Sequence, residues 1–271
     1  MKEIKGQKTL VEAITKIFDI FKTSETTIRP HFILTGESGS GKSFTIMNIC
    51  QSLDIPFMEI NAAQLTKEGT SGNSVSKVLA PLARTGGRPY VCFVDEFDKL
   101  FISGNCNSDL AHESTNGVQN EFLKILESNE ASVFGDYGKY INVPISNVLF
   151  VFAGAFNGES DITLDRLREL GLKTEFLGRV GLVFNTEPLN LDTLFEIFDG
   201  SKLFNDYIEL FSDIDKEKAL YEIKDKIKEN FENNTLGARM INTLIHQYFI
   251  NGGFKECSEK KVTFQKKLTF N

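Results

Sequence analysis

The sequence predicts an α/β protein in which a doubly wound parallel sheet is followed by a smaller helical region. Short apolar runs, typical of buried parallel strands, alternate with segments of helical periodicity over the first 190 residues. Strand signals stop at about residue 191, and three groups of apolar residues at helical spacing follow. We therefore predict a large α/β domain at residues 1–190 and a small helical domain with a short C-terminal tail at residues 191–271.

Each element of the first domain rests on a local pattern. Runs of apolar residues that end in polar or glycine-rich turns predict strands, and apolar residues three or four positions apart predict helices. A polar stretch at residues 105–116 predicts a loop before a further amphipathic helix. In chain order we expect a helix at 10–21, strands at 32–34 and 56–60, a helix at 75–83, a strand at 90–94, a helix at 118–126, a hairpin or extended excursion at 137–143, and a strand at 148–152.

The helical region has a similar basis. Its apolar residues cluster at 194–198, 223–231 and 240–249, with helical spacing in each cluster. From residue 260 the pattern alternates between apolar residues and lysines, which predicts a short terminal strand.

The segment after the first strand reads Gly-Glu-Ser-Gly-Ser-Gly-Lys-Ser and leads into a predicted helix, which is the setting of a phosphate-binding P-loop. Glycines let the backbone turn tightly, so that N–H groups point at a phosphate, and the helix adds its positive N-terminal dipole. In this motif Lys42 reaches the β- and γ-phosphates and Ser43 ligates Mg²⁺. The predicted nucleotide-binding residues are Gly36, Glu37, Ser38, Gly39, Ser40, Gly41, Lys42, Ser43 and Phe44.

About fifty residues later an apolar strand ends in Asp95 and Glu96. Carboxylates at the C-terminal end of a parallel strand lie where an open α/β sheet binds its ligand. We expect Asp95 to hold the Mg²⁺ hydration shell and Glu96 to polarise the attacking water. Together with the P-loop, this pair predicts ATP hydrolysis with Mg²⁺ as the cofactor.

Net charge, hydropathy and cysteine spacing argue against several classes of protein. The formal net charge is −7, which gives no overall attraction to nucleic acid. No apolar run approaches the ~20 residues that span a bilayer, so we expect no membrane attachment. The four cysteines are dispersed without a C-x-x-C pair, which is typical of unpaired thiols in a cytoplasmic protein.

Five further segments carry a family resemblance. Ile4-Lys5-Gly6-Gln7 resembles the N-terminal motif of AAA+ modules. The remaining four, at residues 117–127, 147–156, 175–180 and 236–245, are similar in order and content to ClpX and HslU. The chain thus resembles a P-loop AAA+ ATPase of the Clp/HslU type, over nearly its whole length.

The resemblance implies further roles. Arg179 matches the arginine finger, which reaches across a subunit interface to the neighbour's γ-phosphate, and Arg239 matches sensor 2, which contacts the nucleotide of its own subunit. It also implies a homo-oligomeric ring, a hexamer, that acts on a protein substrate or adaptor in the cytoplasm. A compact module of this kind suits a protein encoded by a phage.

Several features depart from the family pattern. On the resemblance we expect no counterpart of the zinc-binding N-terminal domain of ClpX or of its Ile-Gly-Phe loop, which docks a peptidase. The aromatic pore loop aligns with Gly69-Thr70-Ser71-Gly72, which has no aromatic residue. Sensor 1, a polar residue in many AAA+ proteins, falls at Gly154-Ala155; this resembles a Gly-Gly-Ala-Phe stretch of ClpX and is therefore a family trait, with Asn157 as a substitute candidate.

Two alternative functions stay open at this point. One is an AAA+ switch or loader on nucleic acid, which Lys67 favours and the net charge opposes. The other is an ATP-gated scaffold without translocation, which the missing aromatic residue permits.

Overall fold

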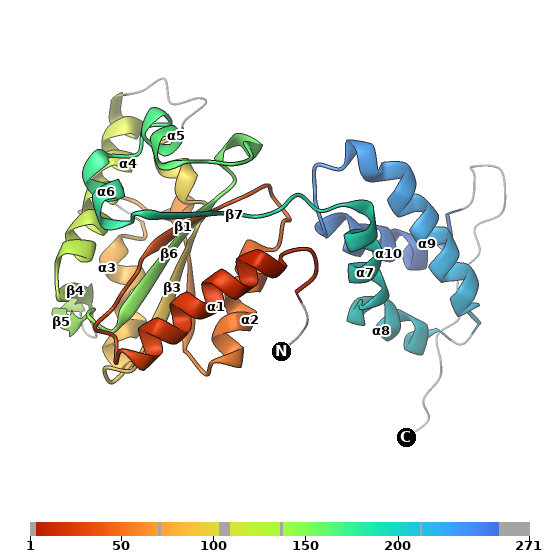
Figure 1. Ribbon diagram of the computed structural model, residues 1–271, viewed down its shortest axis with the longest axis horizontal. Coiled ribbons are helices and arrows are strands. Elements are labelled where there is room, and N and C mark those ends of the chain that lie inside the picture. Colours follow the sequence, from red (N-terminus) through yellow and green to blue (C-terminus); the bar gives the residue numbers. More distant parts are fainter. Residues whose placement is uncertain (1–3, 70–71, 103–108, 136–137, 212, 255–271) are drawn as a thin grey trace. The chain divides into compact units, whose positions relative to one another are not determined.

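The computed structural model describes residues 4–69, 72–102, 109–135, 138–211 and 213–254, with only the backbone at 109–115. The chain forms two compact units, residues 1–37 with 42–186 and residues 38–41 with 187–271 (Figure 1). The predicted α/β class, with a parallel sheet and a C-terminal helical region, is confirmed. The domain boundary at residue 190 stays a prediction.

The first unit is built on a five-stranded sheet in which every neighbouring pair is parallel. The strand order is β2-β3-β6-β1-β7. The sequence pattern missed β7, since this edge strand has only four residues and none of them is fully buried. The strands are β1 (Phe32–Thr35), β2 (Phe57–Asn61), β3 (Tyr90–Asp95), β6 (Val148–Gly154) and β7 (Leu182–Asn185).

Successive residues of the central strands point to opposite faces of the sheet, and both faces are covered. Phe32 and Leu34 pack against α1 (Lys8–Thr23) and α2 (Lys42–Ser52) on one face. Ile33 belongs to a second apolar cluster on the other face, which includes residues of η3 (Phe97–Leu100), α4 (Asp109–Glu127), α5 (Leu164–Glu169) and α6 (Thr174–Arg179) (Figure 1). Burial on both faces explains why these strands read as continuous apolar runs.

Two predicted helix boundaries are wrong. The helix expected at 75–83 is divided into α3 (Val75–Val78) and the 3-10 helix η2 (Ala80–Arg84). Pro81 lies at the start of η2, and a proline removes a backbone donor and disfavours helical geometry in the residue before it.

The second wrong boundary is the start of α4, which begins at Asp109 inside the stretch predicted as a loop. Val118 and Phe122 on this helix are buried. Once such a buried turn has formed, extending the helix costs little per residue, so a polar segment before it can remain helical.

An antiparallel hairpin follows α4. The excursion predicted at 137–143 is confirmed as its second strand, β5 (Tyr140–Pro144), whereas the first strand, β4 (Glu130–Phe134), was not predicted. The Tyr140 hydroxyl donates to Glu68 Oε1 at 2.5 Å, and the Ser76 hydroxyl donates to Glu68 Oε2 at 2.6 Å. Glu68 thereby joins the hairpin to α3.

From residue 187 onward, the regular elements that the structure describes in the second unit are helices. The three predicted groups fall on α7 (Leu191–Asp199), α9 (Lys216–Asn230, with Phe231 in η6, Phe231–Asn233) and α10 (Arg239–Asn251). The short helix α8 (Lys202–Leu210) was not predicted, although its residue Phe204 is buried in the core of the unit.

Several sequence expectations lie outside the described residues: Thr70 and Ser71 of the pore-loop position, Cys106, Cys257, and the strand expected from residue 260. Cys50 and Cys92 are described, and both are buried free thiols, as expected from their apolar surroundings.

His31 connects the start of β1 to β6 through a buried hydrogen bond. Its Nδ1 accepts from the Phe150 N–H at 3.0 Å, and only 8% of the residue is exposed. Burial, with the charge of Arg29 as a smaller cause, lowers the pKa of His31 to about 4. The fold therefore favours the neutral imidazole.

This buried imidazole makes stability depend on pH. The pKa of His31 is lower in the folded chain than its unfolded value of about 6.5. Its contribution to the free energy of unfolding is therefore complete above pH 6.5 and is lost as the pH falls toward 4. We expect the free energy of unfolding to fall by about 2 kcal/mol between pH 7 and pH 5 through this residue alone. Urea titrations at both pH values should show a smaller fall for His31→Gln, which cannot titrate, and equal falls would contradict the assignment.

Candidate nucleotide-binding site

The site predicted from the sequence forms at the carboxyl edge of the sheet. The P-loop leaves β1 after Thr35, and β3 ends in Asp95. These strands are separated by β6, whose last residue, Gly154, is in register with Thr35. The parallel arrangement therefore gathers the ends of β1, β3 and β6 at one edge, where open α/β sheets bind their ligands.

The loop at residues 36–41 has the backbone that a phosphate cradle requires. Gly36, Gly39 and Gly41 all have positive φ, at 152°, 77° and 88°. A Cβ on Gly36 would lie 1.7 Å from Thr186 Oγ1, so no other residue fits there without a shift. Immediately after the loop, α2 begins at Lys42, which directs the helix N-terminus at the loop.

Lys42 folds back over the loop. Its Nζ donates to the carbonyl oxygens of Gly36 at 2.6 Å and Glu37 at 2.9 Å. Ser43 follows in the first turn of α2, and Phe44 is 43% exposed beside it. The lysine is thus held beside the first two residues of the loop.

The side chain of Ser40 bears on whether the loop fits a nucleotide. Its hydroxyl is buried, and it has no hydrogen-bond partner among the described residues. Buried polar atoms are rarely left unpaired. A phosphate oxygen would satisfy this hydroxyl, so the donors of the loop fit a nucleotide.

Arg239, at the start of α10, is grouped with residues 38–41 in the second unit. Its Nη1 donates to Ser38 Oγ at 3.3 Å, and the Ala238 N–H donates to the Gly39 carbonyl at 3.1 Å. The predicted sensor 2 residue therefore lies beside the tip of the loop within that unit.

The two predicted carboxylates differ in their surroundings. Burial raises the pKa of Asp95, although the Glu96 N–H, which donates to Asp95 Oδ1 at 2.9 Å, and the charge of Lys42 oppose the shift. Glu96 is exposed and has a left-handed backbone, with φ at 54°. The turn therefore places the Asp95 carboxylate at the edge of the sheet and the Glu96 side chain in solvent.

Arg179 ends α6, and its Nη2 lies 3.2 Å from Glu127 Oε1 at the end of α4. About half of each side chain is exposed. An exposed single ion pair is weak, so this guanidinium can exchange Glu127 for another anion at little cost.

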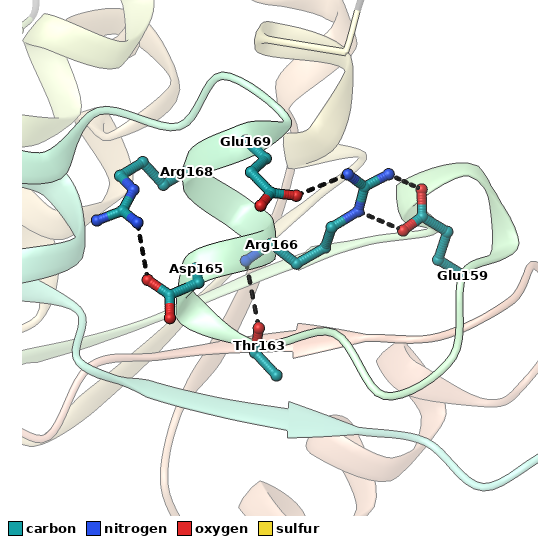
Figure 2. A network of polar contacts seen from close by, with 6 residues as sticks. All are labelled: Glu159, Thr163, Asp165, Arg166, Arg168 and Glu169. Atoms are coloured by element: carbon teal, nitrogen blue, oxygen red, sulfur yellow. Dashed lines mark hydrogen bonds and ion pairs between the residues drawn. The ribbon is translucent and has the colours of Figure 1, made fainter.

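Two neighbouring arginines, Arg166 and Arg168, bind carboxylates close to them in the sequence (Figure 2). Arg166 makes two hydrogen bonds to Glu159, at 2.6 and 2.7 Å, and a third to Glu169 at 3.0 Å. Arg168 pairs with Asp165 at 3.0 Å. Arg166 is therefore held by two carboxylates, whereas Arg168 and Arg179 each pair with one exposed carboxylate among the described residues.

Sequence reasoning missed two polar residues at this edge. Asn185, at the end of β7, accepts from the Thr35 hydroxyl at 2.5 Å and from the Ile162 N–H at 2.7 Å. Asp98 is buried against Gly154, the position predicted for sensor 1. A polar residue directly after an apolar run was the available signal for Asn185. Asn157, the substitute candidate, follows Gly154 with φ at 60°.

Comparison with known proteins agrees with this geometry. The family model described as "ATPase family associated with various cellular activities (AAA)" matches residues 32–170, which include both the P-loop and the β3 carboxylates. The chain belongs to this family. It is accordingly an ATPase, as the sequence predicted.

The similarity to individual relatives is longer than the family match. The ATP-dependent Clp protease ATP-binding subunit ClpX of Bacteroides fragilis is 25% identical over 89% of this chain and 69% of its own length. ClpX of Porphyromonas gingivalis is 27% identical, and ClpX 2 of Wolinella succinogenes is 28% identical, each over 87% of this chain and 68% of its own length. The predicted resemblance to Clp-type AAA+ ATPases is confirmed. A phage origin gains no support from these relatives.

In the part of the chain that the structure describes, no helix is both long enough and apolar enough to cross a membrane.

The different positions of Lys42 and Glu96 lead to different expected defects. Lys42→Ala should weaken ATP binding by roughly 100-fold, because it removes a charged donor from ground-state phosphates. Glu96→Gln should keep ATP affinity and lower turnover by roughly 100-fold or more, because a general base acts only in the reaction. Nucleotide titration and phosphate release separate the two. Normal turnover in Glu96→Gln would contradict the assignment of the base.

Proposed function

We propose that this protein is a Mg-ATP-hydrolysing, ring-forming AAA+ protein that remodels or unfolds a protein substrate or complex. The observation that carries the proposal is the extent of the similarity to ClpX. It covers 87 to 89% of the chain, whereas the family match ends at residue 170. The likeness therefore includes helical residues beyond the ATPase core, where AAA+ proteins differ in function.

In this proposal the nucleotide is held by residues 36–44, with Lys42 on the β- and γ-phosphates. Ser43 and Asp95 would hold Mg²⁺, and their oxygen donors fit an ion that takes one or two protein ligands beside phosphates and water. When bound, Mg²⁺ would neutralise charge on the phosphates. Glu96 would orient the attacking water and accept its proton, for which its exposed position at the sheet edge is suitable.

A homo-oligomeric ring, in our proposal a hexamer, completes the site. Arg179 would enter the neighbouring subunit's site, and its weak pairing with Glu127 supports this role. Arg239 would act on the nucleotide of its own subunit, which its contact with Ser38 supports. A guanidinium stabilises negative charge on a transferring phosphoryl group in either place.

A second candidate is an ATP-gated scaffold that does not translocate its client. The observation in its favour is the sequence Gly69-Thr70-Ser71-Gly72, which supplies no bulky side chain at the pore-loop position. A role on nucleic acid is less favoured, because a net charge of −7 repels the phosphate backbone.

A mixing experiment tests the shared site. Arg179→Ala and Lys42→Ala are each expected to be inactive alone, since one lacks the finger and the other the phosphate contact. In mixed rings about a quarter of the interfaces should pair an intact P-loop with an intact finger, so ATPase activity should partly recover. Phosphate release after co-assembly measures this. No recovery in demonstrated mixed rings would rule out action in trans.

Pulling on a tagged model substrate separates remodelling from scaffolding. We expect the unmodified protein to unfold a stable substrate poorly, because Thr70 and Ser71 offer little apolar contact area. Thr70→Tyr should raise the unfolding rate at unchanged ATPase activity, whereas Thr70→Val, of similar size to threonine, should not. Efficient unfolding by the unmodified chain, unaffected by alanine at both positions, would show that grip lies elsewhere.

A further inference from the structure

Asp98 is a buried carboxylate directly behind the predicted catalytic turn. Its side chain is 2% exposed, and it lies in η3, two residues after Glu96. Oδ2 accepts a hydrogen bond from the Phe156 N–H at 3.2 Å, and Lys99 Nζ lies 3.8 Å from the same oxygen. Burying a carboxylate is costly, so its position needs compensating contacts of this kind.

The other carboxylate oxygen lies against the end of β6. A Cβ on Gly154 would be 2.5 Å from Asp98 Oδ1 and 2.9 Å from Asp98 Cβ and Cγ. The backbone of Gly154 does not have positive φ, so conformational freedom is not the reason for glycine here. The close approach of Asp98 is sufficient to explain it.

Asp98 joins two turns that both hold unfavourable backbone. Glu96 has φ at 54°, and Phe156 and Asn157 have φ at 46° and 60°. A non-glycine residue in this region persists only where its surroundings fix it. Asp98 follows Glu96 in the chain, and its side chain accepts a hydrogen bond from Phe156 in the other turn. It therefore fixes the position of the two turns relative to each other.

We propose that Asp98 is a positioning residue for ATP hydrolysis, which holds the turn that carries Glu96 against the turn that follows Gly154. The inference rests on the proposed role of Glu96 as the base. Asp98 has no part in the P-loop, so its effect falls on the reaction and not on nucleotide binding. A general base displaced by about 1 Å loses on the order of 100-fold in rate.

The first test compares Asp98→Ala with Asp98→Asn. Alanine removes the acceptor for the Phe156 N–H, and kcat should fall by roughly 10- to 100-fold while ATP affinity changes little. Asparagine keeps an oxygen of similar reach, and should retain most of the wild-type kcat. Steady-state phosphate release and nucleotide titration give the two quantities separately.

A general loss of stability is excluded by a matched control. Ile17→Ala removes a buried side chain from α1, on the opposite face of the sheet, and should lower the unfolding midpoint without lowering kcat. Gly154→Ala should also lower kcat, because its methyl group meets the Asp98 carboxylate. In the Asp98→Ala background the same substitution should cost less, since the nearest contact is then Asp98 Cβ at 2.9 Å.

The outcomes distinguish the inference from the assignment on which it rests. Wild-type kcat in Asp98→Ala, with turnover abolished in Glu96→Gln, overturns the role of Asp98 and leaves the base in place. Normal turnover in Glu96→Gln overturns the base itself. An equal loss of kcat in Asp98→Ala and in an equally destabilised Ile17→Ala would reduce Asp98 to a structural residue and overturn the proposal.

Discussion

The parallel sheet imposes the constraint on which the rest of the protein depends. Both faces of the sheet are covered by helices and apolar side chains, so chemistry is confined to the loops at its edges. Because every neighbouring pair is parallel, the loops that follow β1, β3 and β6 leave the same edge. The P-loop, the Asp95–Glu96 pair and Gly154 are thus brought together by strand direction, although they are far apart in the sequence.

The position of β6 between β1 and β3 also limits what the edge can contain. A side chain on Gly154 would compete for the volume that the Asp98 carboxylate occupies. The polar group at this point is therefore supplied by Asp98, from η3 after β3, and not by β6 itself. Asp98 thereby accepts the hydrogen bond of the Phe156 N–H, and the end of β6 needs no side chain of its own at this point.

The motif residues of the candidate site were easier to predict from the sequence than the residues that hold them in place. The P-loop and the β3 carboxylates depend on residue types at fixed spacing, which the sequence displays directly. Asp98 and Asn185 act through partners 58 and 23 residues away, and no local pattern encodes such pairs. The strands and α-helices that were missed, β4, β7, α5, α6 and α8, have nine residues or fewer, which is too short for a clear periodic pattern. The early start of α4 was missed because polar composition was read as a loop.

Phenylalanine packing connects the parts of the site that lie on one face of the sheet. Phe97, directly after Glu96, has its ring centroid 4.7 Å from that of Phe152 on β6 and 5.1 Å from that of Phe176 on α6. The helix that ends in Arg179 and the turn that carries Glu96 therefore share one aromatic core. Packed interiors deform little, so a displacement of α6 has to be accommodated by Phe97. The packing of Phe97 thus connects the turn that carries the proposed base with the helix that ends in the proposed arginine finger.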